Sequence, residues 1–102
     1  MITEIREILG LSQAEIASLL SVAESTITSW STGMVPGRYH SSIERIHGLA
    51  LVLLKEIKPS RIPESVRRKE SWLEDRSIID VITADGVAPI YAYLNRLFEY
   101  NR

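Results

Sequence analysis

The chain has no cysteine among its 102 residues. This excludes a disulfide framework, a thiolate metal site and a cysteine nucleophile, and it fits a reducing cytoplasm. Long apolar runs are also missing, because the longest one, residues 49–54, is far shorter than the roughly 18 residues of a membrane helix. Residues 1–6 do not combine a basic segment with an apolar run, so we expect no signal peptide. We therefore expect a cytoplasmic protein without a membrane partner.

The sequence holds no motif that is typical of catalysis or metal binding. The two histidines, His40 and His47, have no Asp, Glu or third His placed to complete a ligand set. A glycine-rich phosphate loop and a Ser-His-Asp set are both missing. We therefore expect no metal site, no cofactor and no enzymatic activity.

Basic residues are scarce in the first third of the chain. Residues 1–36 carry one base and four acids, a net charge of −3. Residues 37–70 carry eight bases and four acids, a net charge of +4, and residues 71–102 carry three bases and five acids, a net charge of −2. Nucleic-acid-binding modules usually carry their bases on the element that meets phosphate. In this chain the basic residues are concentrated in the middle segment, residues 37–70.

Apolar residues recur at helical spacing throughout, and no segment alternates with period two, so we predict an all-α fold. Gly10 is typical of a helix C-cap, and Ser12 with Glu15 forms a capping-box pattern. Helices are expected over 3–9, from 12 to about 20, over 24–30, from 41 or 42 to about 57, over 64–71, from 77, and from 85. We expect an N-terminal bundle with a long bridging helix, 1–58, followed by a small C-terminal helical element, 59–102.

Residues 11–33 closely resemble the helix-turn-helix of the Xre/Cro family. Ala17 allows two helices to approach closely, and Ile27 and Trp30 bury one face of the second helix while its other face stays polar. The family usually has Gly where Ser21 stands and a polar cap where Ala23 stands. The matching positions are Gln13, Ala17, Leu20, Val22, Ser25, Thr26, Ile27, Trp30, Gly33 and Pro36.

The resemblance implies that this unit binds double-stranded DNA. The exposed face of the second helix would enter the major groove, although it holds no Arg, Lys, Gln or Asn, which make the strongest base contacts. By the same resemblance, Gln13 and Thr26 would bind phosphates, and Arg38 in the following loop would add a phosphate contact. The residues expected to contact DNA are Gln13, Glu24, Ser25, Thr26, Thr28, Ser29 and Arg38.

Residues 66–94 resemble the toxin-binding domain of the Xre/MbcA/ParS-type antitoxins. The family's glycine before the basic residue is replaced by Asp75, and its proline by Ile78. The resemblance implies an antitoxin that binds a RES-domain toxin, covers the active site with which that toxin degrades NAD, and represses its own operon. The residues in register are Leu73, Arg76, Ser77, Asp80, Val81, Ile82 and Gly86.

Partner binding is expected along the C-terminal half. Trp72 fits either an anchor for a partner or a contact that holds the last helices against the long one. The tail 100–102 is expected to enter the pocket of the toxin. The residues expected to contact the toxin are Trp72, Arg76, Ser77, Asp80, Tyr93, Tyr100 and Arg102. Because helix-turn-helix readers usually pair to cover two half-sites, we also expect a homodimer or higher oligomer.

Two other functions remain open at this point. The first is a stand-alone Xre-family repressor whose C-terminal helices dimerise it. The second is a protein-interaction adaptor without DNA binding. The basic run 67–69 is similarly open, either as a solvated helix face or as a phosphate contact.

Overall fold

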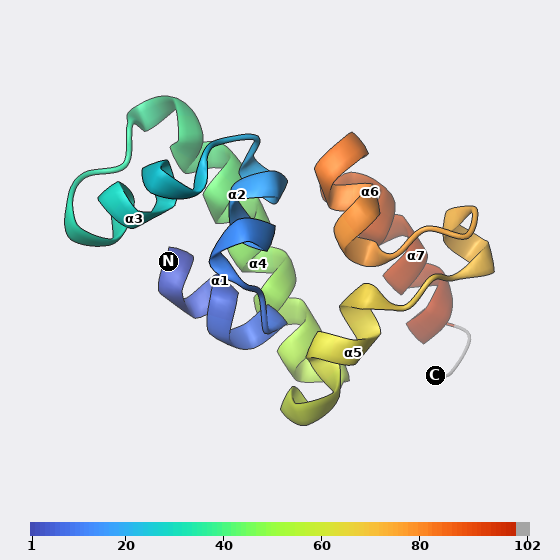
Figure 1. Cartoon of the computed structure of the whole chain (residues 1–102). Coiled ribbons are helices and arrows are strands. Elements are labelled where there is room, and N and C mark those ends of the chain that lie inside the picture. Colours follow the sequence, from blue (N-terminus) through green and yellow to red (C-terminus); the bar gives the residue numbers. More distant parts are fainter. Residues whose placement is uncertain (100–102) are drawn as a thin grey trace.

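The computed structural model describes residues 1–99, which form an all-helical fold (Figure 1). The predicted fold class is therefore confirmed. An isolated bridge between Glu70 and Arg76 is the extent of β-pairing in this range. The α-helices are α1 (Ile2–Leu9), α2 (Gln13–Leu20), α3 (Glu24–Thr32), α4 (His40–Glu56), α5 (Ile62–Arg67), α6 (Ile78–Asp85) and α7 (Ala88–Glu99), with 3₁₀ turns η1 (Gly37–Tyr39), η2 (Pro59–Arg61) and η3 (Ser71–Leu73).

The helix ends follow the local sequence. Ser12 and Ser77 each cap the helix that follows them in a complete capping box, and the box at Ser12 confirms the prediction from the sequence. Gly10 ends α1 in the left-handed conformation, at φ 64°, and the N–H of Leu11 donates to the carbonyl of Arg6 at 3.0 Å. This is the glycine-ended C-cap expected from the sequence.

Two expected boundaries were wrong. The helix expected over 64–71 occupies Ile62–Arg67, and the backbone of Arg68 is extended, so the chain leaves the helix there. The last helix starts at Ala88 and not at Asp85, because Asp85 is the final residue of α6. Gly86, at φ 84°, separates the two helices.

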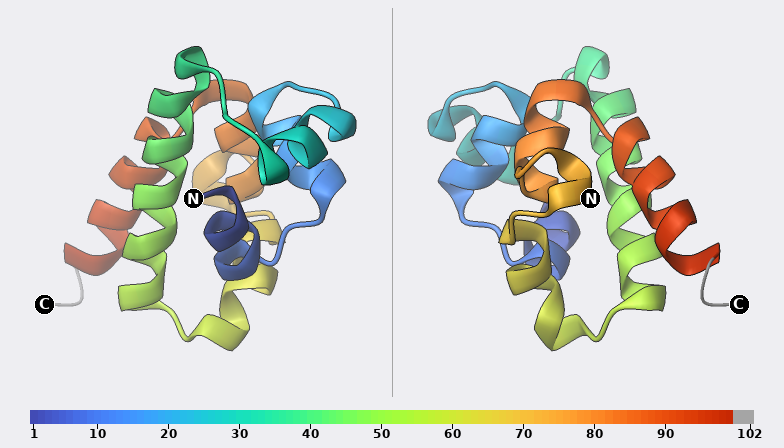
Figure 2. Two further views of the ribbon diagram at one scale, coloured as in Figure 1. Left: turned by 90° about the vertical axis from the view of Figure 1, so that its left-hand side faces the viewer. Right: turned by 90° about the vertical axis from the view of Figure 1, so that its right-hand side faces the viewer.

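The long helix α4 packs against α1 and the 3₁₀ turn η1. α2 packs on α3 and α6, and α5 packs on both α1 and α6. Figure 2 shows α4 and α7 toward one side of the molecule and α2 and α3 toward the other. One apolar core joins residues 1–58 to residues 59–99, since Ile5, Leu53, Val66 and Ile90 are all fully buried in it. The core is therefore continuous across the expected boundary at residue 58.

Arg67 ties α5 to the turn between α1 and α2. Its guanidinium donates to both carboxylate oxygens of Glu15, at 2.7 and 3.1 Å, and to the carbonyls of Gly10 at 2.6 Å and Pro63 at 2.8 Å. The hydrogen bond from Arg67 holds the pKa of Glu15 below its usual value. Arg67, the first residue of the basic run 67–69, is therefore held by hydrogen bonds to other residues of the chain.

Within residues 1–99, no helix has both the length and the apolar character needed to cross a bilayer.

Candidate functional site

α2 and α3 meet through a tight turn at residues 21–23. The N–H of Val22 donates to the carbonyl of Ala17 at 2.9 Å, and the N–H of Ser21 donates to Ser18 at 3.1 Å. This pair of bonds places Ser21 in the left-handed region, at φ 56°, where glycine is the favoured residue. Ala17 is buried, and its small side chain lets α2 and α3 approach closely.

α3 has one buried face and one exposed polar face. Ile27 is fully buried and Trp30 is 9% exposed, so both pack into the core as the sequence predicts. Ala23 supplies no side-chain cap to the start of the helix. No base lies on α3, so its outer face offers hydroxyl groups and one carboxylate. The exposed side chains expected to face DNA are Glu24, Ser25, Thr28 and Ser29.

Gln13 connects α2 to α3. Its amide nitrogen donates to the carbonyl of Glu24 at 3.0 Å and to the hydroxyl of Thr28. The hydroxyl of Thr28 in turn donates to the same carbonyl at 3.3 Å. The amide nitrogen of Gln13 thus already has two acceptors within the protein, Glu24 and Thr28. Thr26 is half-buried in the first turn of α3, and its backbone N–H donates to Ala23 at 3.0 Å.

Arg38 stands at the end of a stack of side chains behind α3. Its guanidinium carbon lies 5.0 Å from the ring centre of Tyr39, a cation–π distance. The ring of Tyr39 lies 4.7 Å from that of Trp30, tilted by 52°. The stack fixes the connection from α3 to α4 and leaves the charge of Arg38 exposed to solvent.

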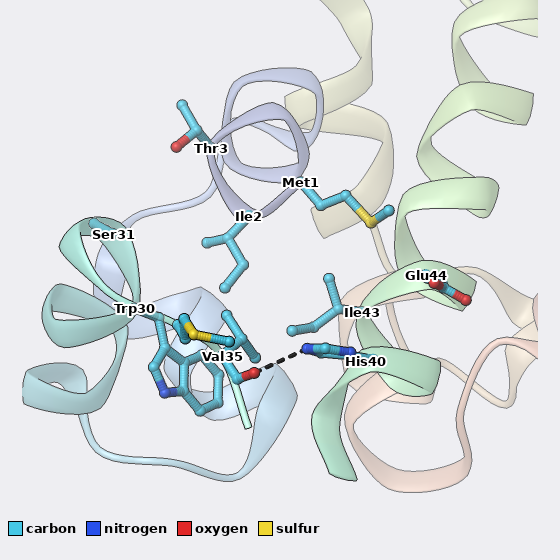
Figure 3. Close-up of a pocket in the computed structure, with 10 residues that line it drawn as sticks. Met1, Ile2, Thr3, Trp30, Ser31, Val35, His40, Ile43 and Glu44 are labelled. Carbon is cyan, nitrogen blue, oxygen red and sulfur yellow. Dashed lines mark hydrogen bonds between the residues drawn. The ribbon is translucent and has the colours of Figure 1, made fainter. Parts of the chain in front are cut away.

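An apolar cavity of about 510 Å³ lies between the start of α1, the end of α3 and the start of α4 (Figure 3). Ile2, Trp30 and Ile43 line it, and His40 Nε2 lies 2.8 Å from the carbonyl oxygen of Val35 across its edge. Its walls come from three separate segments of the chain. The sequence pattern therefore gave no signal for this cavity.

In the C-terminal half, three of the expected partner residues line one hollow. Trp72, Arg76 and Tyr93 surround a depression of about 250 Å³. Trp72 is 67% exposed, so the alternative in which it holds the last helices against α4 is wrong. The guanidinium carbon of Arg96, which the sequence analysis missed, lies 6.0 Å from the centre of the Trp72 ring. Burial raises the pKa of Tyr93, which is half-buried in this hollow.

A strained turn presents Trp72. Glu74 and Asp75 are consecutive residues in the left-handed region, at φ 59° and 60°, which costs on the order of 1 kcal/mol or more for each non-glycine residue. The N–H of Asp75 donates to the carbonyl of Glu70 at 3.0 Å, and the N–H of Glu70 donates to that of Arg76 at 3.1 Å. These bonds close residues 70–76 into a compact turn with the tryptophan on its outer side.

The other expected partner residues have local roles. Ser77 is buried, and its hydroxyl accepts from the N–H of Asp80 at 3.1 Å. The backbone N–H of Ser77 donates to the Asp80 carboxylate at 3.0 Å and lowers the pKa of that acid. Arg76 donates to Asp85 at 3.0 Å and to the carbonyl of Leu73 at 3.1 Å. Ser77 and Asp80 thus shape the start of α6 and do not line the hollow.

The tail residues Tyr100 and Arg102 lie outside the described residues.

No family model, no curated protein and no solved structure matches this chain. Two surfaces therefore stand as the candidates for function: the exposed polar face of α3, and the hollow beside Trp72.

Proposed function

We propose that the chain is the antitoxin of a cytoplasmic toxin–antitoxin pair and the repressor of its own operon. In this proposal the hollow beside Trp72 and the C-terminal tail cover the active site of a RES-type, NAD-degrading toxin. The exposed face of α3 reads operator DNA as part of a homodimer or higher oligomer. The chain itself performs no chemistry and acts by steric occlusion and by binding.

The backbone at two positions carries the proposal. The resemblance places glycine where this chain has Ser21 and Asp75, and both residues have positive φ, at 56° and 60°. Glycine is the residue that adopts this conformation without strain. Both halves of the resemblance therefore agree with the backbone at the two positions where the family has glycine and this chain does not.

Partner binding is tested first by recovering the tagged chain from its native host and releasing the protein that co-purifies. The proposal expects a stoichiometric partner that depletes NAD once it is released. Trp72→Ala should weaken the complex about thirtyfold or more, because an exposed aromatic anchor carries much of the affinity of an interface.

Met34→Ala is the matched control for Trp72→Ala. Met34 is 92% exposed and lies in the loop after α3, so the variant also removes an exposed apolar side chain without disturbing the core. Equal neutralisation of the toxin by both variants would count against the Trp72 surface. Deletion of residues 100–102 tests the tail separately, and unchanged neutralisation would remove it from the inhibitory contact.

DNA binding is tested with a duplex of the operon's own promoter. Affinity should fall steeply between about 50 and 200 mM salt, since phosphate contacts release counterions. Ser29→Glu, on the exposed face of α3, should lower affinity about tenfold or more, because it adds a charge that repels phosphate. Ser60→Glu, at an exposed serine of η2, is the matched control and should have no effect.

Two observations favour a second candidate, an adaptor that binds the toxin without binding DNA. α3 holds no base, and the amide nitrogen of Gln13 already donates to Glu24 and Thr28. An adaptor would neutralise the toxin and show no salt-dependent binding to the promoter duplex, which separates the two functions in the same pair of assays.

A further inference from the structure

A groove of about 700 Å³ lies where the two halves of the molecule meet. The end of α2, η1 and the first half of α4 form one wall, and the end of α6 with the start of α7 forms the other. Its volume is within the roughly 300–1,000 Å³ of small-molecule sites, which often lie between structural units. Neither the hollow beside Trp72 nor the outer face of α3 is part of it, and Arg38 is the residue that it shares with the expected DNA contacts.

The floor of the groove is apolar and its sides carry aromatic rings. Leu20, Ile46 and Ile82 line it and are each less than a tenth exposed, at 8%, 5% and 6%. The half-buried rings of Tyr39 and Tyr91 also line it, one from η1 and one from α7. A floor of this kind accepts a flat, apolar ring.

The charge left over in the groove is positive. Arg38 and Arg45 both line it and are exposed, and neither takes part in an ion pair within residues 1–99. The acid on its lining, Asp85, is neutralised by Arg76 at 3.0 Å. Two guanidinium groups without carboxylate partners suit a phosphate, which accepts hydrogen bonds from such groups in a fixed geometry.

We propose that this groove binds a small organic phosphate that carries a flat ring, the chemistry of a mononucleotide. The ring lies on the apolar floor beside Tyr91, and the phosphate lies between Arg38 and Arg45. Because the walls belong to the two halves of the chain, a bound ligand contacts both halves at once. The site goes beyond the proposed antitoxin function and does not depend on it.

The test is isothermal titration calorimetry of the full chain with AMP, GMP, CMP and UMP. We expect at least one of them to bind with a Kd below about 1 mM. The matching nucleoside and inorganic phosphate, titrated separately, should each bind about tenfold more weakly or worse, because each lacks one half of the recognition. Failure of all four nucleotides to bind overturns the proposal.

Variants locate the binding. Arg38→Gln and Arg45→Gln should each lower the affinity about tenfold or more, through the loss of a charge-assisted hydrogen bond. Arg61→Gln, at an exposed base of η2 outside the groove, should leave it unchanged. Thermal unfolding of each variant checks that the fold is intact. Nucleotide binding that all three variants retain equally overturns the site. The proposal is also overturned if Arg38→Gln and Arg45→Gln lose promoter binding while the chain binds no nucleotide, because the two bases then contact DNA instead.

Discussion

Replacing Arg67 with methionine should destabilise the fold by about 2 kcal/mol. The variant keeps the apolar stem but removes the guanidinium, which donates to Glu15 twice and to the carbonyls of Gly10 and Pro63. The side chains of Arg67 and Glu15 are 38% and 34% exposed, so their ion pair contributes only about 0.5 kcal/mol. Each carbonyl bond adds about 0.5–1.5 kcal/mol. Urea unfolding measures the loss, which corresponds to a fall of about 10 °C in Tm.

The neighbouring base supplies a matched control. Arg68 contacts Glu64 one turn away at 3.4 Å, and both side chains are more than half exposed. Arg68→Met should therefore change the free energy of unfolding by less than about 0.5 kcal/mol. A double-mutant cycle of Arg67→Met with Glu15→Gln should give a coupling energy of about 0.5–1 kcal/mol. Equal, small effects of Arg67→Met and Arg68→Met would refute the reasoning, because the contacts to Gly10 and Pro63 would then add nothing.

Three further outcomes follow from single positions. Gly48→Ala should stabilise the fold by about 0.5–1 kcal/mol in urea unfolding. A Cβ at this position of α4 meets only the hydroxyl of Tyr91, at 3.5 Å. A destabilised variant would show that α7 packs more tightly there. Ser21→Gly should raise Tm by a few degrees, because it relieves a φ of 56°; a lower Tm would mean that the serine has another role. The pKa of Glu15 is lower in the folded chain than in the unfolded chain, so Glu15 is protonated first in the unfolded chain as the pH falls. The ion pair with Arg67 therefore stabilises the fold above about pH 4.3 and is lost below it. Glu15→Gln should make the loss of stability in acid shallower, and an unchanged pH profile would contradict this assignment.

Local features of the chain were predictable from sequence. The capping box at Ser12 and the glycine cap at Gly10 formed as expected, because each depends on hydrogen bonds within a few residues. The inward faces of Ile27 and Trp30 followed from helical spacing in the same way. Helix ends without a side-chain cap, such as that of α5, were placed less well.

The candidate surfaces were decided by tertiary packing. The spacing of residues in the sequence does not predict the contact of Arg96 with Trp72 or that of Arg67 with Glu15. Each contact joins segments that are distant along the chain. Whether Trp72 is buried or exposed also depended on the turn formed by residues 70–76.

The sequence by itself therefore determined that the chain is helical, where most helices start, and which faces are apolar, because these properties depend on local hydrogen bonding and periodicity. Only the tertiary structure decided which polar side chains stay exposed. Packing of α2 against α3 gave the amide nitrogen of Gln13 two acceptors, and packing of α5 against the α1–α2 turn engaged Arg67. Arg38 and Arg45 remained without ion-pair partners in residues 1–99. A side chain is available to a ligand only when the rest of the fold leaves its donors unpaired.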